Sequence, residues 1–287
     1  GSTGGESLGL LAQFNLPADP PENNAPAPAA AHLLVEAGRL AWADRRLYLA
    51  DTDFEPVPLR GLLAPDYLTA RAQLISPTRA LAEVTAGNPD WSTPNLAPEP
   101  PQPEHGTSHL SIVDDAGDAI SLTTTVQDVF GSRIVVGGFV LNNELTDFSF
   151  APALGGRPVA NRVAPGKRPL SSMSPTLVFD TRGNLRFVLG SAGGARIIGD
   201  VAEALLGLLD WHLTPAETVA LAHVSTTGAT ADLEENSSAS ALRAPLAAQG
   251  HQVQDYKSIA GLQIIALTPQ GLRAAADPHR EGTAASD

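Results

Sequence analysis

A run of prolines most constrains how this chain can fold. Six prolines lie between residues 89 and 103. Proline fixes φ and lacks an amide hydrogen, so neither a helix interior nor a central strand can continue through such a run. We therefore expect a semi-extended linker that ends at Gly106, with different structure on its two sides.

The residues before the linker have the spacing of helices. Apolar side chains recur at helical intervals over residues 31–51, which predicts an amphipathic helix, and a second such pattern covers roughly residues 65–84. Ahead of them, the residues around 19–24 are rich in proline and asparagine and predict a loop.

After the linker the apolar period changes to two. Residues 109–114 and 119–126 alternate as strands do, and the four residues between them favour a tight turn, which predicts a hairpin. A long helix is expected after Gly194, and another begins at the capping box formed by residues 214–217. Further strands are expected at 134–136, 139–141, 176–180, 185–189, 252–256, 262–267 and 272–276. This order indicates an α+β fold with mostly antiparallel sheets.

Charge and composition exclude several classes of function. The 287 residues carry 18 basic and 31 acidic side chains, a net charge of −13, and the basic ones do not cluster as nucleic-acid binding requires. No apolar run reaches the roughly 20 residues of a membrane helix. Cysteine is absent, which excludes disulfides and thiolate catalysis. We expect no nucleic-acid partner and no membrane segment.

Metal and cofactor motifs are also missing. The chain has seven histidines, but no His-Glu-x-x-His motif, which would place two metal ligands on one helix face. The Gly-rich residues 190–194 lie between a predicted strand and a predicted helix, yet they lack the order of a nucleotide-binding loop. We therefore expect neither a metal nor a cofactor.

A threonine follows glycine at the end of the linker. If the Gly106–Thr107 bond were cut, Thr107 would carry a free α-amine beside its own hydroxyl, so one residue would supply both nucleophile and base. Local sequence alone favours a simpler interpretation, in which Thr107 only begins a strand.

Eight blocks of residues carry a more specific signal. They cover 43–45, 51–58, 107–114, 117–125, 141–149, 167–176, 190–197 and 277–280. In this order they closely resemble blocks of the γ-glutamyltransferases, which are N-terminal-nucleophile (Ntn) hydrolases. The resemblance implies an αββα sandwich of stacked antiparallel sheets between helical layers, incomplete here at the N-terminus. It further implies that 1–106 is the C-terminal part of a large subunit and that 107–287 is a small subunit.

Catalytic roles follow from the resemblance, residue by residue. Thr107 would attack the γ-glutamyl carbonyl after self-cleavage at Gly106–Thr107. Thr125, on the facing strand, would orient Thr107 through a hydrogen bond. Gly193 and Gly194 would offer backbone N–H groups to the oxyanion, a role that suits glycine because the main chain must approach closely.

Substrate-binding roles follow in the same way. Carboxylates and an amide would bind the α-ammonium group of the glutamyl moiety, and hydroxyls would bind its α-carboxylate. The ammonium partners implied are Gln127, Glu144 and Asp147, and the carboxylate partners are Ser171 and Ser172. No catalytic role is assigned to His109, since a lone histidine is more often structural.

The implied reaction is transfer of a γ-glutamyl group from an amide such as glutathione to water or an amino acid, through acyl-Thr107 and without a cofactor. Two partners are implied, a small γ-glutamyl substrate and the protein's own cleaved large-subunit segment in a heterodimer. The sequence leaves the compartment open, although the resemblance favours the periplasm or the exterior.

Three departures from the family pattern modify these expectations. Gln127 stands where asparagine is usual, and the segment between Asp147 and Ser171 is short, which predicts an open site favouring hydrolysis. The chain begins with Gly1, and its one methionine is Met173, so we expect that a preceding part is missing, together with the arginine that would bind the α-carboxylate. Activity of these residues alone is then expected to be weak or absent, unless a separate polypeptide supplies that part.

Two alternatives remain open. One is an acylase of the same fold that acts on glutaryl groups, as cephalosporin acylases do, although Asp147 disfavours it because a glutaryl group has no ammonium. The other is an inactive truncated remnant, which predicts an uncut chain.

Overall fold

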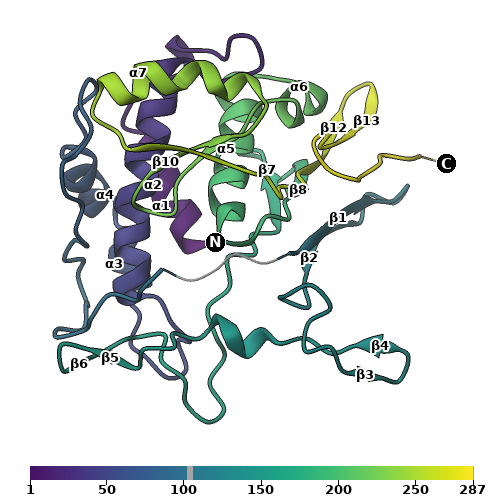
Figure 1. Cartoon of the computed structure of the whole chain (residues 1–287). Helices are drawn as coiled ribbons and strands as arrows, with labels where there is room; N and C mark the ends of the chain where they lie inside the picture. The colour runs from purple at the N-terminus through teal and green to yellow at the C-terminus, as the bar shows by residue number, and fades with distance from the viewer. Residues whose placement is uncertain (102–105, 287) are drawn as a thin grey trace.

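The computed structural model describes residues 1–101 and 106–286. The end of the expected linker, residues 102–105, therefore lies outside the described residues. The segment between β2 (Ala119–Thr124) and β7 (Thr176–Phe179) passes beneath the helical part of the molecule as an extended loop that carries short hairpins (Figure 1). Among the described residues, no helix combines the length and apolarity needed to cross a membrane.

Helices dominate the part before the linker. They are α1 (Ser2–Leu11), α2 (Pro28–Tyr48), α3 (Leu59–Leu62) and α4 (Pro65–Ala72), with a 3-10 turn at Leu16–Ala18. Leucines of α1 and α2 share a buried core with Leu206 and Trp211 from the second half of the chain. The two parts of the chain are therefore packed together.

The helix boundaries correct the expectations in three places. The first predicted helix begins at Pro28 and ends at Tyr48. The second ends at Ala72 rather than near residue 84, since Pro77 disfavours helical conformation at the residue before it. The sequence pattern did not indicate α1, because its glycines weaken the helical signal. Gly9 lets Leu68 pack closely against α1, since a Cβ there would lie 2.6 Å from Leu68 Cδ1.

A four-stranded antiparallel sheet forms the centre of the second part. Its order is β13-β12-β8-β7, and its strands are β7 (Thr176–Phe179), β8 (Leu185–Gly190), β12 (Gln263–Thr268) and β13 (Gly271–Ala276). Leu189 packs against Ile197 and Leu205 of α5 (Ile197–Leu209), and α6 (Pro215–Val219) contacts β12 and β13. Helices therefore cover one face of this sheet.

The predicted hairpin covers the other face. It pairs β1 (Ser108–Val113) with β2 (Ala119–Thr124). Side chains alternate along a strand, so Gly190 faces away from the helix side that Leu189 contacts, and there it meets the imidazole of His109. A helical layer, a four-stranded sheet and a two-stranded sheet thus stack in that order, as expected.

The two faces of the hairpin have an unusual polarity. The inner face is polar, with His109 hydrogen-bonded to Thr123 and Ser121 Oγ donating to Leu189 O at 2.9 Å. The outer face is apolar and exposed; its side chains are Leu110, Ile112, Ile120 and Leu122. An exposed apolar face of this kind is typical of a surface that packs against another polypeptide.

A third sheet departs from the antiparallel expectation. It joins β9 (Val224–Ser225), β10 (Ala231–Glu234) and β11 (Val253–Tyr256), and the β10–β11 pair is parallel. A 3-10 turn (Ser238–Leu242) and α7 (Arg243–Ala248) make the crossover that a parallel pair requires. The sequence pattern predicted β11 but neither β9, β10 nor α7.

The remaining elements are short. Two small hairpins are formed by β3 (Val135–Val136) with β4 (Phe139–Val140) and by β5 (Ala153–Leu154) with β6 (Arg157–Pro158). Further 3-10 turns cover Glu144–Asp147 and Gly194–Arg196. The predicted capping box is confirmed, because Thr214 N donates to Glu217 Oε2 at 2.8 Å and Glu217 N donates to Thr214 Oγ1 at 3.3 Å.

Candidate active site

Most of the predicted site residues line one pocket. Of the nine, the pocket collects Thr107, Thr125, Gln127, Glu144, Asp147, Ser171, Ser172 and Gly194. Gly193 is the exception and lies one residue behind the pocket wall. The pocket is formed by the hairpin, by the 3-10 turn of residues 144–147, by the loop before β7 and by the turn before α5.

The hairpin register places the predicted nucleophile opposite Thr125. Ser108 pairs with Thr124, so the residues one step further along, Thr107 and Thr125, face each other. Thr107 is 9% exposed. The spacing of eighteen residues predicted this proximity, because a tight turn fixes which residues of a hairpin are opposite.

The hydroxyl of Thr125 is hydrogen-bonded to the carbonyl oxygen of Gly106, the residue before Thr107. Thr125 Oγ1 accepts a hydrogen bond from Gln127 N at 2.8 Å, so its own hydrogen is free to donate, and it donates to Gly106 O at 2.8 Å. The predicted role was to orient Thr107. Here the hydroxyl hydrogen is instead directed at the carbonyl of the Gly106–Thr107 bond, the bond predicted to be cut, which we call the scissile bond.

One wall of the pocket is acidic. The side-chain amide of Gln127 donates to Asp147 Oδ1, and Asn161 Nδ2 donates to Asp147 O at 2.7 Å. Burial and the nearby Asp147 carboxylate raise the pKa of Glu144. Gln127 has φ 74°, a left-handed conformation that asparagine adopts more readily. The longer glutamine nevertheless reaches the carboxylate it was expected to accompany.

The pocket also contains an arginine that was not predicted, in what we call its basic wall. Arg45 Nη2 donates to Ser172 Oγ at 3.1 Å, and Arg45 also lines the pocket. Burial lowers the pKa of Arg45 to about 10, against the opposing effect of Glu99 and Asp147, so its guanidinium stays charged at neutral pH. The block 43–45 matched the family pattern, but nothing in the sequence indicated that its arginine would reach Ser172.

An ion pair holds the loop that carries Ser171 and Ser172. Both oxygens of Asp51 accept hydrogen bonds from Arg168, at 2.8 Å from its backbone N and 2.9 and 3.0 Å from its guanidinium. These hydrogen bonds hold the pKa of Asp51 well below its ordinary value. Lys167 Nζ donates to Ala160 O at 2.6 Å and anchors the same loop. Residues before the linker thus position residues after it.

The two glycines before α5 adopt conformations that other residues avoid. Gly193 has φ 139° and Gly194 has φ 61°. Gly194 borders the pocket beside Ala195 and Ile197. A Cβ at Gly193 would lie 3.0 Å from Asp200 Oδ2, so this position is also crowded from behind. Both observations explain why glycine is required here.

His109 has a structural environment, as expected. Its Nδ1 lies 2.8 Å from Thr123 Oγ1 and its Nε2 lies 3.1 Å from Ser111 Oγ. Burial lowers the pKa of His109 to about 4, so the ring is neutral at pH 7. The His109 ring packs against Gly190 and so positions the hairpin on β8.

Comparisons with known proteins agree with this arrangement. A sequence profile described as Gamma-glutamyltranspeptidase matches residues 1–287. A Glutathione hydrolase proenzyme of Pseudomonas aeruginosa is 36% identical over 264 residues, covering 88% of this chain and 45% of that protein. An Acylase ACY 1 proenzyme of Pseudomonas sp. strain V22 is 33% identical over 258 residues, covering 88% of this chain and 43% of that protein.

A solved structure shows the same fold. Mutant W525D of the gamma-glutamyltranspeptidase of Pseudomonas nitroreducens has a TM-score of 0.55 and 34% identity, covering 62% of this chain and 98% of that chain. The predicted α+β, Ntn-hydrolase class is thereby confirmed. The chain spans less than half the length of the two curated relatives named above. By the profile and by these likenesses, the chain belongs to the gamma-glutamyltranspeptidase family of enzymes.

Proposed function

We propose that this chain transfers γ-glutamyl groups from amides such as glutathione to water or an amino acid, through an acyl-Thr107 intermediate formed after self-cleavage at the scissile bond. Residues 1–106 would then be the end of the large subunit and 107–287 the small subunit. The observation that carries the proposal is the pocket itself, in which Thr107 lies between an acidic wall and a basic one.

The two walls match the charges of a γ-glutamyl group. Its α-ammonium would lie against Asp147 and Glu144, with Gln127 holding the Asp147 carboxylate in place. Its α-carboxylate would accept hydrogen bonds from Arg45 and the hydroxyls of Ser171 and Ser172. Hydrogen bonds to charged groups contribute about 1.5–3 kcal/mol each, so a zwitterionic head would bind there in one orientation.

Self-cleavage uses the geometry around Gly106. Thr107 Oγ attacks the Gly106 carbonyl carbon, its proton passes to the Thr107 nitrogen, and the C–N bond breaks to leave an ester. Breaking the C–N bond frees the Thr107 amine. Water then hydrolyses the ester, which releases the Gly106 carboxylate and restores the Thr107 hydroxyl. The hydroxyl of Thr125 already donates to the oxygen that becomes negative in the first step.

Turnover repeats this chemistry on the substrate. The free amine of Thr107 takes the proton from Oγ as this oxygen attacks the γ-carbonyl carbon, and it returns the proton to the departing amine. Backbone N–H groups of Gly193 and Gly194 would stabilise the oxyanion. Water or an amino acid then attacks the acyl-Thr107 ester, and no cofactor takes part.

We propose that a further polypeptide segment completes the active enzyme. The hairpin that begins directly after Thr107 exposes an apolar outer face, and the relatives named above are more than twice as long as the matched region. That additional segment, in the same chain or a separate one, would cover the face. Turnover by these 287 residues alone is then weak, although Arg45 supplies one carboxylate contact.

A glutaryl acylase is the second candidate, because the Acylase ACY 1 proenzyme is a sequence relative. A glutaryl group carries a carboxylate but no ammonium. It would place no positive charge beside the half-buried carboxylates of Glu144 and Asp147, and two such negative charges close together are unfavourable without a cation near them. The acidic wall therefore favours the γ-glutamyl substrate.

Three measurements test the proposal. Intact mass after incubation at neutral pH should show fragments that end at Gly106 and begin at Thr107, and Thr107→Ala should stay uncut. A diazoketone analogue of glutamine should then label Thr107, and γ-glutamyl anilide should be hydrolysed faster than glutaryl anilide. An uncut, unlabelled wild-type chain would support the inactive remnant instead.

A further inference from the structure

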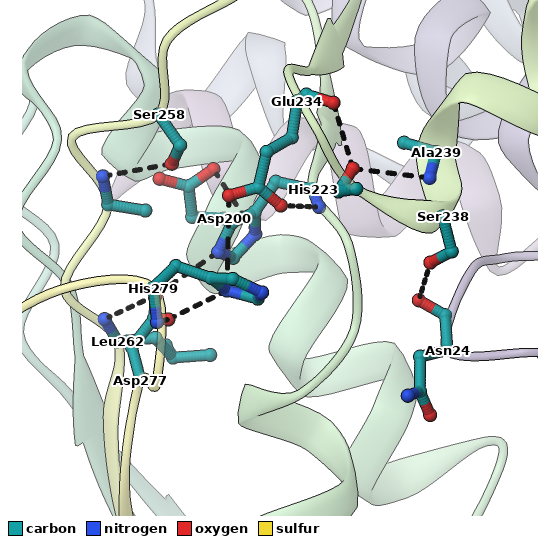
Figure 2. A network of polar contacts seen from close by, with 12 residues as sticks. Asn24, Asp200, His223, Glu234, Ser238, Ala239, Ser258, Leu262, Asp277 and His279 are labelled. Carbon is teal, nitrogen blue, oxygen red and sulfur yellow. Dashed lines mark hydrogen bonds and ion pairs between the residues drawn. The ribbon is translucent and has the colours of Figure 1, made fainter.

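A group of histidines and carboxylates lies apart from the residues that line the pocket (Figure 2). It contains His223, just before β9, and Asp277 and His279, just after β13. One ligand atom from each of these three residues lies within 4.8 Å of the others. Folding brings His223 to Asp277 and His279 from 54 residues away, so no local spacing in the sequence could indicate the whole group.

The distances within the group suit a small cation. His223 Nε2 lies 3.3 Å from Asp277 Oδ2, and His279 Nδ1 lies 2.9 Å from Asp277 Oδ1. Bonds of about 2.0–2.2 Å around a tetrahedral zinc ion place neighbouring ligand atoms about 3.3–3.5 Å apart. Small movements of the three side chains would therefore be enough to surround an ion.

A second observation points to a missing positive charge. Asp200 is 1% exposed, and within the described structure neither of its carboxylate oxygens has a hydrogen-bond partner. Its Oδ1 lies 3.9 Å from His223 Nδ1, the ring nitrogen other than the one that faces Asp277. Glu203 Oε1 is likewise buried without a partner. Buried carboxylates with no hydrogen bonds are costly, unless a cation lies near them.

The charged side chains around the group carry more negative than positive charge. Facing the group are the carboxylates of Asp200, Glu203, Glu234 and Asp277 and the imidazoles of His223 and His279. Arg196 is nearby, but it forms an ion pair with Asp232 at 2.8 Å. The group therefore combines two nitrogen ligands with an excess of buried negative charge.

We propose that His223 Nε2, the Asp277 carboxylate and His279 Nδ1 bind a divalent transition-metal ion of the zinc type. His223 Nδ1 lies 3.4 Å from Glu203 Oε2, so an N–H on this side leaves the Nε2 lone pair directed at the ion. Glu234 Oε1, 3.9 Å from His279 Nδ1, or a water would complete the coordination. The His279 side chain is 33% exposed, which gives the ion a route from solvent.

The ion would join elements that are far apart in the chain. It would hold the segment after β13 against the segment before β9, with α5 beside it through Glu203 and Asp200. Asp200 also backs Gly193, since a Cβ there would lie 3.0 Å from Asp200 Oδ2. Metal binding would thus stabilise the turn that presents Gly193 and Gly194 to the pocket. This site does not depend on the proposed reaction.

Metal titration of the full, tag-free chain tests the proposal. After chelator treatment, Zn²⁺ should bind in one equivalent and raise the melting temperature, and Co²⁺ should give the intense visible bands of tetrahedral coordination. His279→Ala, at a partly exposed position, should weaken binding at least about tenfold. His212→Asn is the matched control, because His212 is exposed and its φ of 54° suits asparagine.

The opposing outcome is equally defined. If the group is only an ion-pair network with a protonated His223, Zn²⁺ will leave the melting temperature unchanged and Co²⁺ will show only the weak bands of the hydrated ion. Equal Zn²⁺ affinity of wild type, His279→Ala and His212→Asn would also overturn the proposal. Wild-type Co²⁺ spectra decide the matter even if a variant fails to fold.

Discussion

Replacing Gly190 by alanine should destabilise the packing of β8 against the hairpin that follows Thr107, the proposed nucleophile. Gly190 lies at the end of β8 and pairs with Gln263. A Cβ there would lie 2.3, 2.5 and 2.8 Å from Cε1, Nδ1 and Nε2 of His109. These separations are too short for non-bonded atoms, so the imidazole has to move.

The size of the effect follows from what holds the ring. His109 is 5% exposed, and its two nitrogens contact Thr123 and Ser111 at 2.8 and 3.1 Å. Moving the ring breaks these two hydrogen bonds, worth about 1 kcal/mol each, and overpacking adds about 1–3 kcal/mol. Partial relaxation offsets some of this sum. Gly190→Ala should lower the free energy of unfolding by about 2–4 kcal/mol.

A double-mutant cycle in urea unfolding isolates this clash. In a His109→Ala background the space is empty, and Gly190→Ala should be neutral or stabilise by about 0.4–1 kcal/mol, because alanine restricts the unfolded chain. The coupling energy is then at least about 2 kcal/mol. Additive effects would show that His109 does not press against Gly190, and the proposed seating of β1 on β8 would be wrong.

Three further predictions concern cleavage, specificity and pH. Thr125→Val should slow cleavage of the scissile bond about 10²–10³-fold, as followed by intact mass, because the hydroxyl that donates to Gly106 O is lost. Thr125→Ser keeps the hydroxyl and should cleave at nearly the normal rate. Equal cleavage rates for the two variants would exclude the hydroxyl from this step. Asp147→Asn should raise the KM for γ-glutamyl anilide about 10–100-fold, because the proposed partner of the substrate ammonium loses its charge. The KM for glutaryl anilide, which has no ammonium, should rise less. An equal rise for both substrates would argue against an ammonium site at Asp147. Burial lowers the pKa of His109 to about 4 in the folded chain, below the value of about 6.5 for an exposed imidazole. As the pH falls from about 6.5 to 4, the His109 ring is therefore protonated in the unfolded chain but still neutral in the folded chain, and this favours unfolding. In that window the wild type should lose ~1–3 kcal/mol relative to His109→Gln in urea unfolding, and parallel pH profiles would contradict a buried neutral ring.

The features predicted from the sequence were those with local causes. The hairpin follows from alternating residues and a tight turn with Gly117 at φ 86°, and the helix at Pro215 follows from its capping box. The resemblance named nine site residues, and eight of them line one pocket. These signals lie within short segments, so no knowledge of tertiary contacts was needed to interpret them.

The features that were missed depend on contacts between distant segments. In β10 all four residues are buried, including Asp232 and Glu234, whose polar side chains gave the sequence the pattern of an exposed segment. Asp232 is buried because Arg196 pairs with it, and Glu234 because His223 N donates to it at 3.1 Å. Arg45 likewise became a pocket residue only through Ser172, 127 positions away.

One hydrogen bond would connect the proposed maturation with the proposed catalysis. Thr125 Oγ1 accepts a hydrogen bond from Gln127 N and donates its hydrogen to Gly106 O. The proposed cleavage would remove that acceptor when Gly106 departs as a carboxylate, while Gln127 N would still hold the oxygen in place. We expect the same hydroxyl then to turn to the new amine of Thr107, opposite it in the hairpin register. On this proposal the predicted contact between Thr125 and Thr107 belongs to the cleaved enzyme, and the uncut chain holds the same group at the bond that would break first.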